Sequence, residues 1–345
     1  MTLATTQLDN IKSIAVLGGG WSGEREISLL SARGITDALQ ESGKYKQVTF
    51  IDVKRDPAQL LKDLTAAKPD IIINGLHGVG GEDGVVQGFL DMLQIPYTHS
   101  GVAASSLGMD KVASRILFMH AGIPVPAWEL CTPEAILEGH RPFPFPWVIK
   151  PRAEGSSIGV SIVKTPEDTL EVCSNWQHGP NILVETYIRG QEINTAVFEG
   201  QSWGSIELRP HEEFYNYYAK YTDGVTDHIM PADVAVNVYQ RIGLLAEKAF
   251  KVVGCRGVAR CDFLYDSTLD KIYLLEINTH PGFTGLSLVP EIARYNGISY
   301  LEVVEKMMLS ALEHFAKDHE VKEQEAPTHE EKETPKPTEA KGKKN

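Results

Sequence analysis

The sequence is poor in cysteine, has no long apolar run and carries no excess of positive charge. Its 345 residues include four cysteines, and 33 Lys and Arg are outnumbered by 46 Asp and Glu, so the net charge is -13. The cysteine spacings match no zinc finger or zinc ribbon. The negative charge argues against nucleic acid or an anionic membrane as the main partner, because both would be repelled. A small anionic ligand held by a few local cations is still compatible with it.

Targeting signals are missing too. No apolar run is long enough to cross a bilayer, and the first ten residues contain no basic stretch followed by an apolar one. We therefore expect a protein of the cytoplasm with reduced thiols and no membrane partner. The length exceeds what one hydrophobic core usually serves, so two or three subdomains are expected.

Strands and helices alternate in the first hundred residues. Apolar runs at 13–17, 48–53 and 70–74 predict strands, and the segments between them predict helices. Such alternation is typical of an α/β unit with a parallel sheet. We therefore expect an N-terminal α/β domain over residues 1–100.

The rest of the chain divides into three further parts. A long helix over about 102–120 is expected within a central α+β subdomain, residues 101–188, and residues 189–316 carry the strands and helices of a C-terminal subdomain. From Lys317 onward almost nothing is apolar, which predicts a disordered charged tail over 317–345. The fold class is α/β (α+β) with three domains.

A glycine-rich turn follows the first strand. Gly18 and Gly20 begin a run that formally satisfies the dinucleotide fingerprint G-x-G-x-x-G. However, Glu24 and Glu26 fall in the first turn of the next helix, where they would repel a pyrophosphate. They suit a ligand ammonium group, or they simply offset the helix dipole. A dinucleotide site is therefore the less favoured interpretation.

Two strand-like runs around Leu269 predict an acidic hairpin. A turn centred there places Asp262 opposite Glu276 and Arg260 opposite Asn278, with all four side chains on one face. Two directly opposed carboxylates repel each other, and a divalent cation removes that conflict. The oxygen donors suit Mg²⁺ better than zinc. The alternative is a solvated polar face on which Arg260 neutralises Asp262.

A loop rich in Ser and Gly follows Lys150, which ends an apolar strand. Ser156 and Ser157 offer hydroxyl and amide donors, and Gly155 and Gly159 permit close backbone approach. Cations and backbone donors are what a phosphate site requires. The run predicts a loop that closes over a triphosphate, or else an ordinary hairpin loop. A second candidate lid is the Tyr-rich segment within 209–232.

Together and in this order, these signals resemble the ATP-grasp superfamily and, within it, the D-alanine–D-alanine ligase family. The resemblance spans about residues 13–312 and implies a three-domain ATP-grasp fold. It is carried by seven blocks: GGGWSGEREISLLSA (18–32), LHGVGGEDGVVQGFLDMLQIPYTHSG (76–101), MDK (109–111), VIKPRAEGSSIGVS (148–161), YYAKY (217–221), GCRGVARCDF (254–263) and LLEINTHPGFTGLSLVP (274–290).

The resemblance implies a nucleotide site and a metal site. Lys111 and Lys150 would contact the α- and β-phosphates, Lys220 the γ-phosphate, Glu185 the adenine and Glu192 the ribose. The metal would be two Mg²⁺ ions, with Mn²⁺ as a substitute, on Asp262, Glu276 and Asn278. The implied ATP-binding residues are Lys111, Lys150, Ser156, Ser157, Glu185, Thr186, Ile188, Glu192, Lys220 and Asn278.

The resemblance also implies two amino-acid subsites. Glu24 would anchor the ammonium of the first D-alanine, and Ser156, Glu24 and Tyr221 would form a hydrogen-bonded triad. Arg260 and the Gly282 amide would stabilise the oxyanion. The implied catalytic residues are Glu24, Ser156, Tyr221, Arg260 and Gly282, and the implied substrate-binding residues are Glu24, His77, Tyr221, Arg260, Gly282, Ser287 and Leu288, the last two holding the second carboxylate.

The activity implied by the resemblance is ATP-dependent joining of two D-alanines through an acyl-phosphate, by a homodimer, for peptidoglycan precursor synthesis. Relatives with the same fold add D-lactate or D-serine instead, but Tyr221 favours an amine nucleophile. An ATP-binding protein without catalysis is the alternative from another class. Two positions depart from the commoner pattern: Thr186 stands where many relatives carry Lys, and His280 stands where a small residue is frequent.

Overall fold

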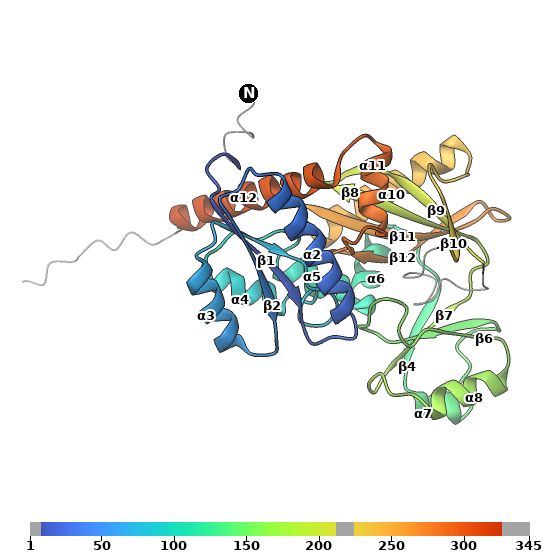
Figure 1. The fold of residues 1–345 in the computed structure, drawn as a ribbon. Helices are drawn as coiled ribbons and strands as arrows, with labels where there is room; N and C mark the ends of the chain where they lie inside the picture. The colour runs from blue at the N-terminus through green and yellow to red at the C-terminus, as the bar shows by residue number, and fades with distance from the viewer. Residues whose placement is uncertain (1–7, 212–223, 326–345) are drawn as a thin grey trace, which may run out of the picture.

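The computed structural model describes residues 8–211 and 224–325, and the side chains up to His319. Three sheets organise these residues: a three-stranded sheet at the N-terminal end, a four-stranded central sheet and a five-stranded C-terminal sheet. Figure 1 shows the central sheet as a lobe of its own, below the C-terminal sheet. No helix in the described ranges has the length and apolar character needed to cross a membrane.

The N-terminal sheet is parallel, as the alternation of strands and helices predicts. Its order is β2-β1-β3, and the completely buried β3 has the sequence IIIN. A strand buried on both faces requires such a continuous apolar run. The elements are β1 (Ser13–Gly19), α2 (Arg25–Glu41), β2 (Gln47–Val53), α3 (Pro57–Ala67), β3 (Ile71–Asn74) and α4 (Val85–Leu93).

The single long helix expected over 102–120 is instead two helices, α5 (Val102–Met109) and α6 (Lys111–His120). The break is at Asp110, whose backbone is extended and whose side chain accepts hydrogen bonds from the amides of Val112 and Ala113. Asp is a favoured N-cap because its carboxylate satisfies amides that the helix leaves unpaired. Lys111 therefore occupies the first position of α6.

The central sheet is antiparallel, with the order β4-β7-β5-β6. Its core contains Trp147, Ile149, Ile182 and Val184, all fully buried. Strand β4 and helix α7, both short, are not predicted from the sequence. The elements are β4 (Trp128–Cys131), α7 (Pro133–Leu137), β5 (Trp147–Lys150), β6 (Ser161–Val163), α8 (Pro166–Ser174) and β7 (Ile182–Thr186).

The C-terminal sheet is antiparallel, and its order is β10-β9-β8-β11-β12. Helix α10 packs on one face together with α5 and α6, and α11 packs on the other. Strand β10 was not identified from the sequence. The elements are β8 (Gln191–Phe198), β9 (Gln201–Pro210), β10 (Thr226–Ile229), α10 (Val236–Val253), β11 (Val258–Asp266), β12 (Lys271–Asn278), α11 (Leu288–Tyr295) and α12 (Tyr300–Glu325).

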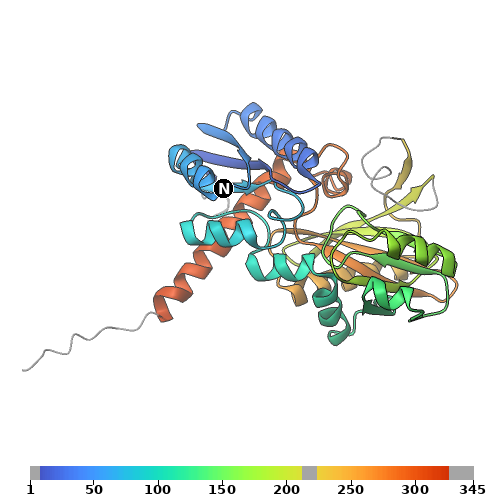
Figure 2. The ribbon, with the colours of Figure 1, turned by 90° about the horizontal axis from the view of Figure 1, so that it is seen from below.

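Helix α12, near the C-terminal end of the described residues, packs against the N-terminal part of the chain. It packs against α2 and β3, and Figures 1 and 2 both place it beside the N-terminal sheet. The expectation of disorder from Lys317 is wrong for 317–325, because the helix continues to Glu325. An ion pair of 2.7 Å between Arg256 and Asp318 contacts this extension. Residues 326–345 lie outside the described residues, and the division into three domains stays a prediction.

Candidate active site

The acidic hairpin has the predicted register at its functional end. Asp262 pairs with Glu276, and Arg260 pairs with Asn278. A β-bulge lies immediately beyond, between Asp262 and Phe263. The carboxylate pair is therefore the last pair of the predicted register, and a bulge one residue earlier would have placed the two side chains on different faces.

Alternation along the two strands separates the hairpin's core from its site. Cys261 and Ile277 lie between the polar residues and are buried in the core shared with α10. Successive side chains of a strand point to opposite faces. The four polar side chains of the hairpin therefore point away from that core, toward the N-terminal and central parts of the molecule.

Each carboxylate of the opposed pair, Asp262 and Glu276, contacts a protein cation. Arg260 makes two hydrogen bonds to Asp262, of 2.7 and 2.8 Å, and Asn278 Nδ2 donates to Asp262 Oδ2 at 3.1 Å. Lys111 Nζ lies 3.2 Å from Glu276 Oε2. Asp262 is only 5% exposed. Arg260 thus neutralises Asp262, but Asp262 is buried and the other three side chains are only partly exposed, so the face is not the solvated surface of the alternative interpretation.

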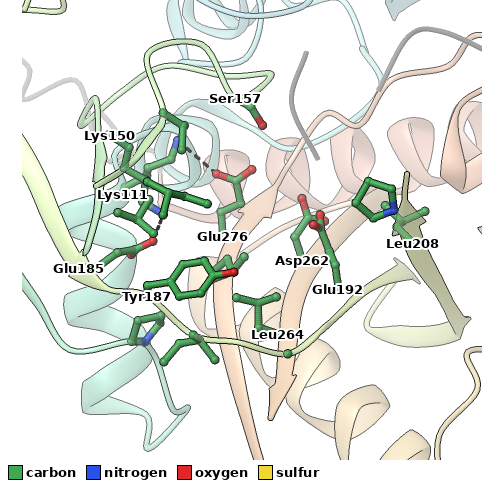
Figure 3. A pocket seen from close by; sticks show the side chains of 18 of the residues that line it. Lys111, Lys150, Ser157, Glu185, Tyr187, Glu192, Leu208, Asp262, Leu264 and Glu276 are labelled. Carbon is green, nitrogen blue, oxygen red and sulfur yellow. Dashed lines mark ion pairs between the residues drawn. The ribbon is translucent and has the colours of Figure 1, made fainter. Parts of the chain in front are cut away.

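A cavity of about 460 Å³ lies between the central and C-terminal sheets. Figure 3 shows the side chains of both sheets that surround it. Its volume falls in the range of small-molecule sites. Residues from the predicted nucleotide and metal sets that line it are Lys111, Lys150, Ser157, Glu185, Thr186, Ile188, Glu192, Asp262 and Glu276; Asn278 lines the neighbouring smaller pocket instead.

A buried ion-pair cluster forms one wall of this cavity. Lys150 Nζ lies 2.7 Å from Glu185 Oε1, and the guanidinium of Arg115 contacts the other carboxylate oxygen. Burial lowers the pKa of Lys150 to about 8, although Glu185 opposes the shift. Arg115 was not identified from the sequence. It lies four residues after Lys111 on α6, a spacing that puts both side chains on one helix face and could have indicated it.

The Ser-rich loop contacts both pockets. Ser156 and Ser157 have φ of +52° and +59°, a left-handed conformation that non-glycine residues rarely adopt. Ser157 lines the large cavity and Ser156 lines the smaller pocket, where its hydroxyl donates to Glu24. A Cβ on Gly155 would lie 2.7 Å from Glu24 Oε2. A side chain at this position would therefore have to displace the Glu24 carboxylate.

The smaller pocket, of about 70 Å³, lies between the N-terminal unit and the hairpin. Glu24, the buried N-cap residue of α2, lines it, whereas Glu26 is exposed and does not. The expectation that both carboxylates face a ligand ammonium is therefore wrong for Glu26. Residues from the predicted catalytic, substrate and metal sets that line the pocket are Glu24, His77, Ser156, Arg260, Glu276, Asn278, Gly282, Ser287 and Leu288.

Helix α11 begins at this pocket. Ser287 is its N-cap residue and makes no side-chain hydrogen bond to the helix, because its Oγ accepts from the amide of Thr284 at 2.8 Å. The amides of a helix N-terminus attract a carboxylate. A Cβ added to Gly282 would lie 3.0 Å from Ser287 Oγ, so a side chain there would crowd the pocket.

A histidine and glutamate cluster lies at the back of the smaller pocket. His77 Nδ1 lies 3.1 Å from Glu82 Oε1, and the ring of His280 is 5.3 Å from that of His77. Burial lowers the pKa of His77 and of His280 to about 4, so both are neutral at pH 7. Glu82 was not identified as a site residue, although its run HGVGGEDG was recognised.

Two residues of the predicted site, Lys220 and Tyr221, lie outside the described residues. The others fall in two adjoining pockets, and the residue that lines both is Glu276. Two sheets enclose a nucleotide-sized cavity, opposed carboxylates lie at its inner end, and a second polar pocket lies beyond them. This arrangement defines an ATP-grasp enzyme.

Comparison with known proteins gives the family. The family model described as D-ala D-ala ligase C-terminus matches residues 117–309. The D-alanine–D-alanine ligase of Sphingopyxis alaskensis is 44% identical over 306 residues, 87% of this chain and 97% of that protein. The ligase of Azorhizobium caulinodans is 45% identical over 306 residues, 87% of this chain and 98% of that protein. This chain belongs to the D-alanine–D-alanine ligase family.

Solved structures agree with this assignment. The D-alanine–D-alanine ligase of Bacillus anthracis, in complex with ATP, superimposes with a TM-score of 0.74 at 25% identity, covering 88% of this chain and 99% of that one. The ligase of Coxiella burnetii gives a TM-score of 0.73 at 26% identity, covering 91% and 97%. The predicted ATP-grasp fold is confirmed.

Proposed function

We propose that this chain joins two D-alanines to D-alanyl-D-alanine and converts ATP to ADP and phosphate. Membership of the ligase family supports the reaction. The observation that supports this reaction in the present chain is the pair of adjoining pockets, both of which Glu276 lines. Such an arrangement brings the end of a nucleotide in one pocket to an amino acid in the other.

ATP would occupy the large cavity. Lys111 and Lys150 enter it as cations, each close to a carboxylate, and a triphosphate would replace or share those contacts. The β7 end of the cavity, with Thr186 and Ile188, would hold the adenine, and Glu192 the ribose. Lys220 would reach the γ-phosphate.

Asp262, Glu276 and Asn278 would hold Mg²⁺, two ions in the full complex, with Mn²⁺ as a substitute. The donor set fits, because it is all oxygen and its two carboxylates are directly opposed on paired strands. Bound there, the metal would offset the charge of the transferred phosphoryl group. Arg260 and Lys111 already neutralise part of the carboxylate charge, since each contacts one of the two carboxylates.

The smaller pocket would hold the two amino acids. Glu24, which lines this pocket, would bind the ammonium of the first, and the N-terminus of α11, at Ser287 and Leu288, would bind the carboxylate of the second. Arg260 and the Gly282 amide would stabilise the oxyanion, a role worth about 3 kcal/mol per donor. Ser156, held by Glu24, and Tyr221 would complete the closing contacts.

The chemistry takes two steps. A carboxylate oxygen of the first D-alanine attacks the γ-phosphorus, and the bond to the ADP oxygen breaks. The amine nitrogen of the second D-alanine then attacks the acyl carbon of the resulting acyl-phosphate, phosphate leaves with the electron pair, and the nitrogen loses a proton. Closure of the Ser-rich loop would exclude the water that otherwise hydrolyses the acyl-phosphate.

The product would serve peptidoglycan precursor synthesis in the cytoplasm, and we propose a homodimer as the working form. Both proposals rest on the family.

The neutral His280 at the wall of the smaller pocket is the feature most suited to alter affinity for the second amino acid.

The deciding experiment measures phosphate release by the purified protein with Mg-ATP and one of D-alanine, L-alanine, D-serine, or D-alanine with D-lactate. We expect release with D-alanine, and a dipeptide by mass spectrometry. Release only with another acceptor would reassign the second subsite. ATP binding without any substrate-stimulated release would replace the proposal by a binding protein.

A further inference from the structure

The back wall of the smaller pocket has the composition and spacing of a transition-metal site. Atoms of His77, Glu82 and His280 that could ligate a metal all lie within 4.8 Å of one another. Glu82 Oε1 is 3.1 Å from His77 Nδ1 and 4.0 Å from His280 Nδ1. Two ligand atoms of a tetrahedral ion with bonds of about 2.0–2.1 Å are roughly 3.3 Å apart, so small side-chain shifts would close this set around an ion.

The orientation of His280 is the strongest sign of a ligand. Its Nε2 lies 2.5 Å from the carbonyl oxygen of Asn74. A carbonyl only accepts, so Nε2 carries the hydrogen and Nδ1 carries the lone pair. Within the described residues Nδ1 has no hydrogen-bond partner, yet the side chain is only 2% exposed and this atom faces Glu82. A backbone carbonyl that orients the far nitrogen is the usual second shell of a metal-bound imidazole.

His77 and Glu82 can also each present a lone pair to the same ion. His77 Nε2 lies 2.9 Å from Ser31 Oγ, and a hydroxyl can either donate or accept. When Ser31 accepts, His77 presents the lone pair of Nδ1 toward Glu82. The side chain of Glu82 is 15% exposed and can supply a carboxylate oxygen.

We propose that His77, Glu82 and His280 bind a single Zn²⁺ ion, and that this ion inhibits the enzyme at the amino-acid pocket. Two imidazoles and one carboxylate with an open position form a zinc donor set, unlike the all-oxygen hairpin. All three residues line the smaller pocket, so the open position is available to a substrate carboxylate or to water. The inhibitory part rests on the proposed function; the metal site itself does not.

A second cluster in the described chain, Glu129, Cys131 and His140, serves as an internal comparison. There, His140 Nε2 is already 2.7 Å from Glu129 Oε1, and both side chains are nearly half exposed. This group has no buried, unpartnered ligand atom like His280 Nδ1. Replacing His140 therefore provides a matched control for replacing His280.

The test measures metal binding directly on the full chain in excess Mg²⁺. Zn²⁺ is titrated against a chromophoric chelator, and Co²⁺ is added separately to record the visible absorption of tetrahedral sites. We expect one tight equivalent in the wild type and in His140→Gln, and at least about tenfold weaker binding in His280→Leu and Glu82→Gln. Glu82→Gln keeps the side-chain shape, so it replaces His280→Leu if the latter melts early.

Two results would overturn the site: equal Zn²⁺ affinity in wild type and in the folded His280 or Glu82 variants, or loss of the tight equivalent in His140→Gln. Phosphate release measured with Zn²⁺ then tests the inhibitory part. We expect the apparent KM for D-alanine to rise with Zn²⁺ while that for ATP stays constant. An active enzyme that binds no Zn²⁺ defeats this inference alone, whereas a protein that binds Zn²⁺ but never releases phosphate defeats the proposed function, and with it the inhibitory part, but leaves the metal site standing.

Discussion

Single residues at the large cavity carry charges that are buried. Lys150 is 6% exposed, and its ammonium is retained beside Glu185, which contacts Arg115 as well. A buried charge is tolerated only when it is paired. Arg115 therefore has a structural role, because it completes the pairing of Glu185 and lets that carboxylate be shared between two cations.

The depressed pKa of Lys150 predicts that nucleotide affinity depends on pH. The folded value is about 8 against an ordinary 10.5, so the folded chain loses this proton first. Its contribution to the unfolding free energy is thus unfavourable below pH 8 and is relieved between pH 8 and 10.5. We expect the Kd for Mg-ATP to rise above pH 8, as the cation that faces the phosphates is lost.

Titration calorimetry from pH 7 to 9.5 checks this expectation, with Lys150→Arg as the matched variant that keeps its charge throughout. The variant should show a flatter pH profile, whatever its absolute affinity. An equally flat profile in the wild type would contradict the role of Lys150.

A conservative change in the carboxylate pair should stop turnover. Glu276→Gln keeps the size of the side chain but removes the charge opposite Asp262 that a divalent cation needs. We expect phosphate release to vanish while the circular dichroism spectrum is unchanged. Glu313→Gln, on the exposed side of α12, makes the same chemical change away from both pockets and should retain wild-type rates. Full turnover in Glu276→Gln would exclude the metal assignment.

At the scale of elements, the hairpin could be predicted because its side chains alternate cleanly and its turn is short. Counting from a turn centred at Leu269 gives the correct pairs from Asp262 to Arg260, whereas the pairs nearer the turn, such as Tyr265 with Ile272, are one residue out of the predicted register; the bulge between Asp262 and Phe263 makes up this difference and brings Glu276 opposite Asp262. Strands β4 and β10 could not be predicted, since each has four residues and lies at a sheet edge. Their pairing depends on neighbours distant in the sequence, which local patterns do not contain.

The break between α5 and α6 predicts a stability effect at Asp110. Loss of the cap in Asp110→Ala should cost about 1 kcal/mol of unfolding free energy and weaken ATP binding, because Lys111 loses its fixed place. Asp110→Asn keeps a good N-cap while removing the charge that faces Arg152. We expect urea unfolding to show a smaller loss in the Asn variant. Equal losses would mean that the ion pair, and not the cap, holds this junction.

Over the whole molecule, cores are shared between segments that are far apart in the sequence. Helices α5 and α6 pack with α10 in the core under the C-terminal sheet, whereas α12 packs with the N-terminal sheet. The consecutive blocks predicted from the sequence, with the helix over 102–120 in the central subdomain, did not include this exchange. Contacts between distant helices depend on which apolar faces meet in space, and periodicity reveals a face without its partner.

Truncation after Ala316 tests what the extension of α12 contributes. It removes the partly exposed ion pair between Arg256 and Asp318, a kind worth about 0–1 kcal/mol. We expect a slightly lower melting temperature by calorimetry and unchanged phosphate release, since neither residue lines the two pockets. A large fall in activity would show that α12 influences the site through the N-terminal unit.

Two consecutive serines of one loop face different pockets, and both hold left-handed backbone conformations. The two serines are joined by one planar peptide unit, so a rotation of this plane moves both of them. A molecule that binds in the large cavity and moves Ser157 would therefore also move Ser156 in the smaller pocket. The two pockets are thus connected through the single peptide plane that joins the two serines.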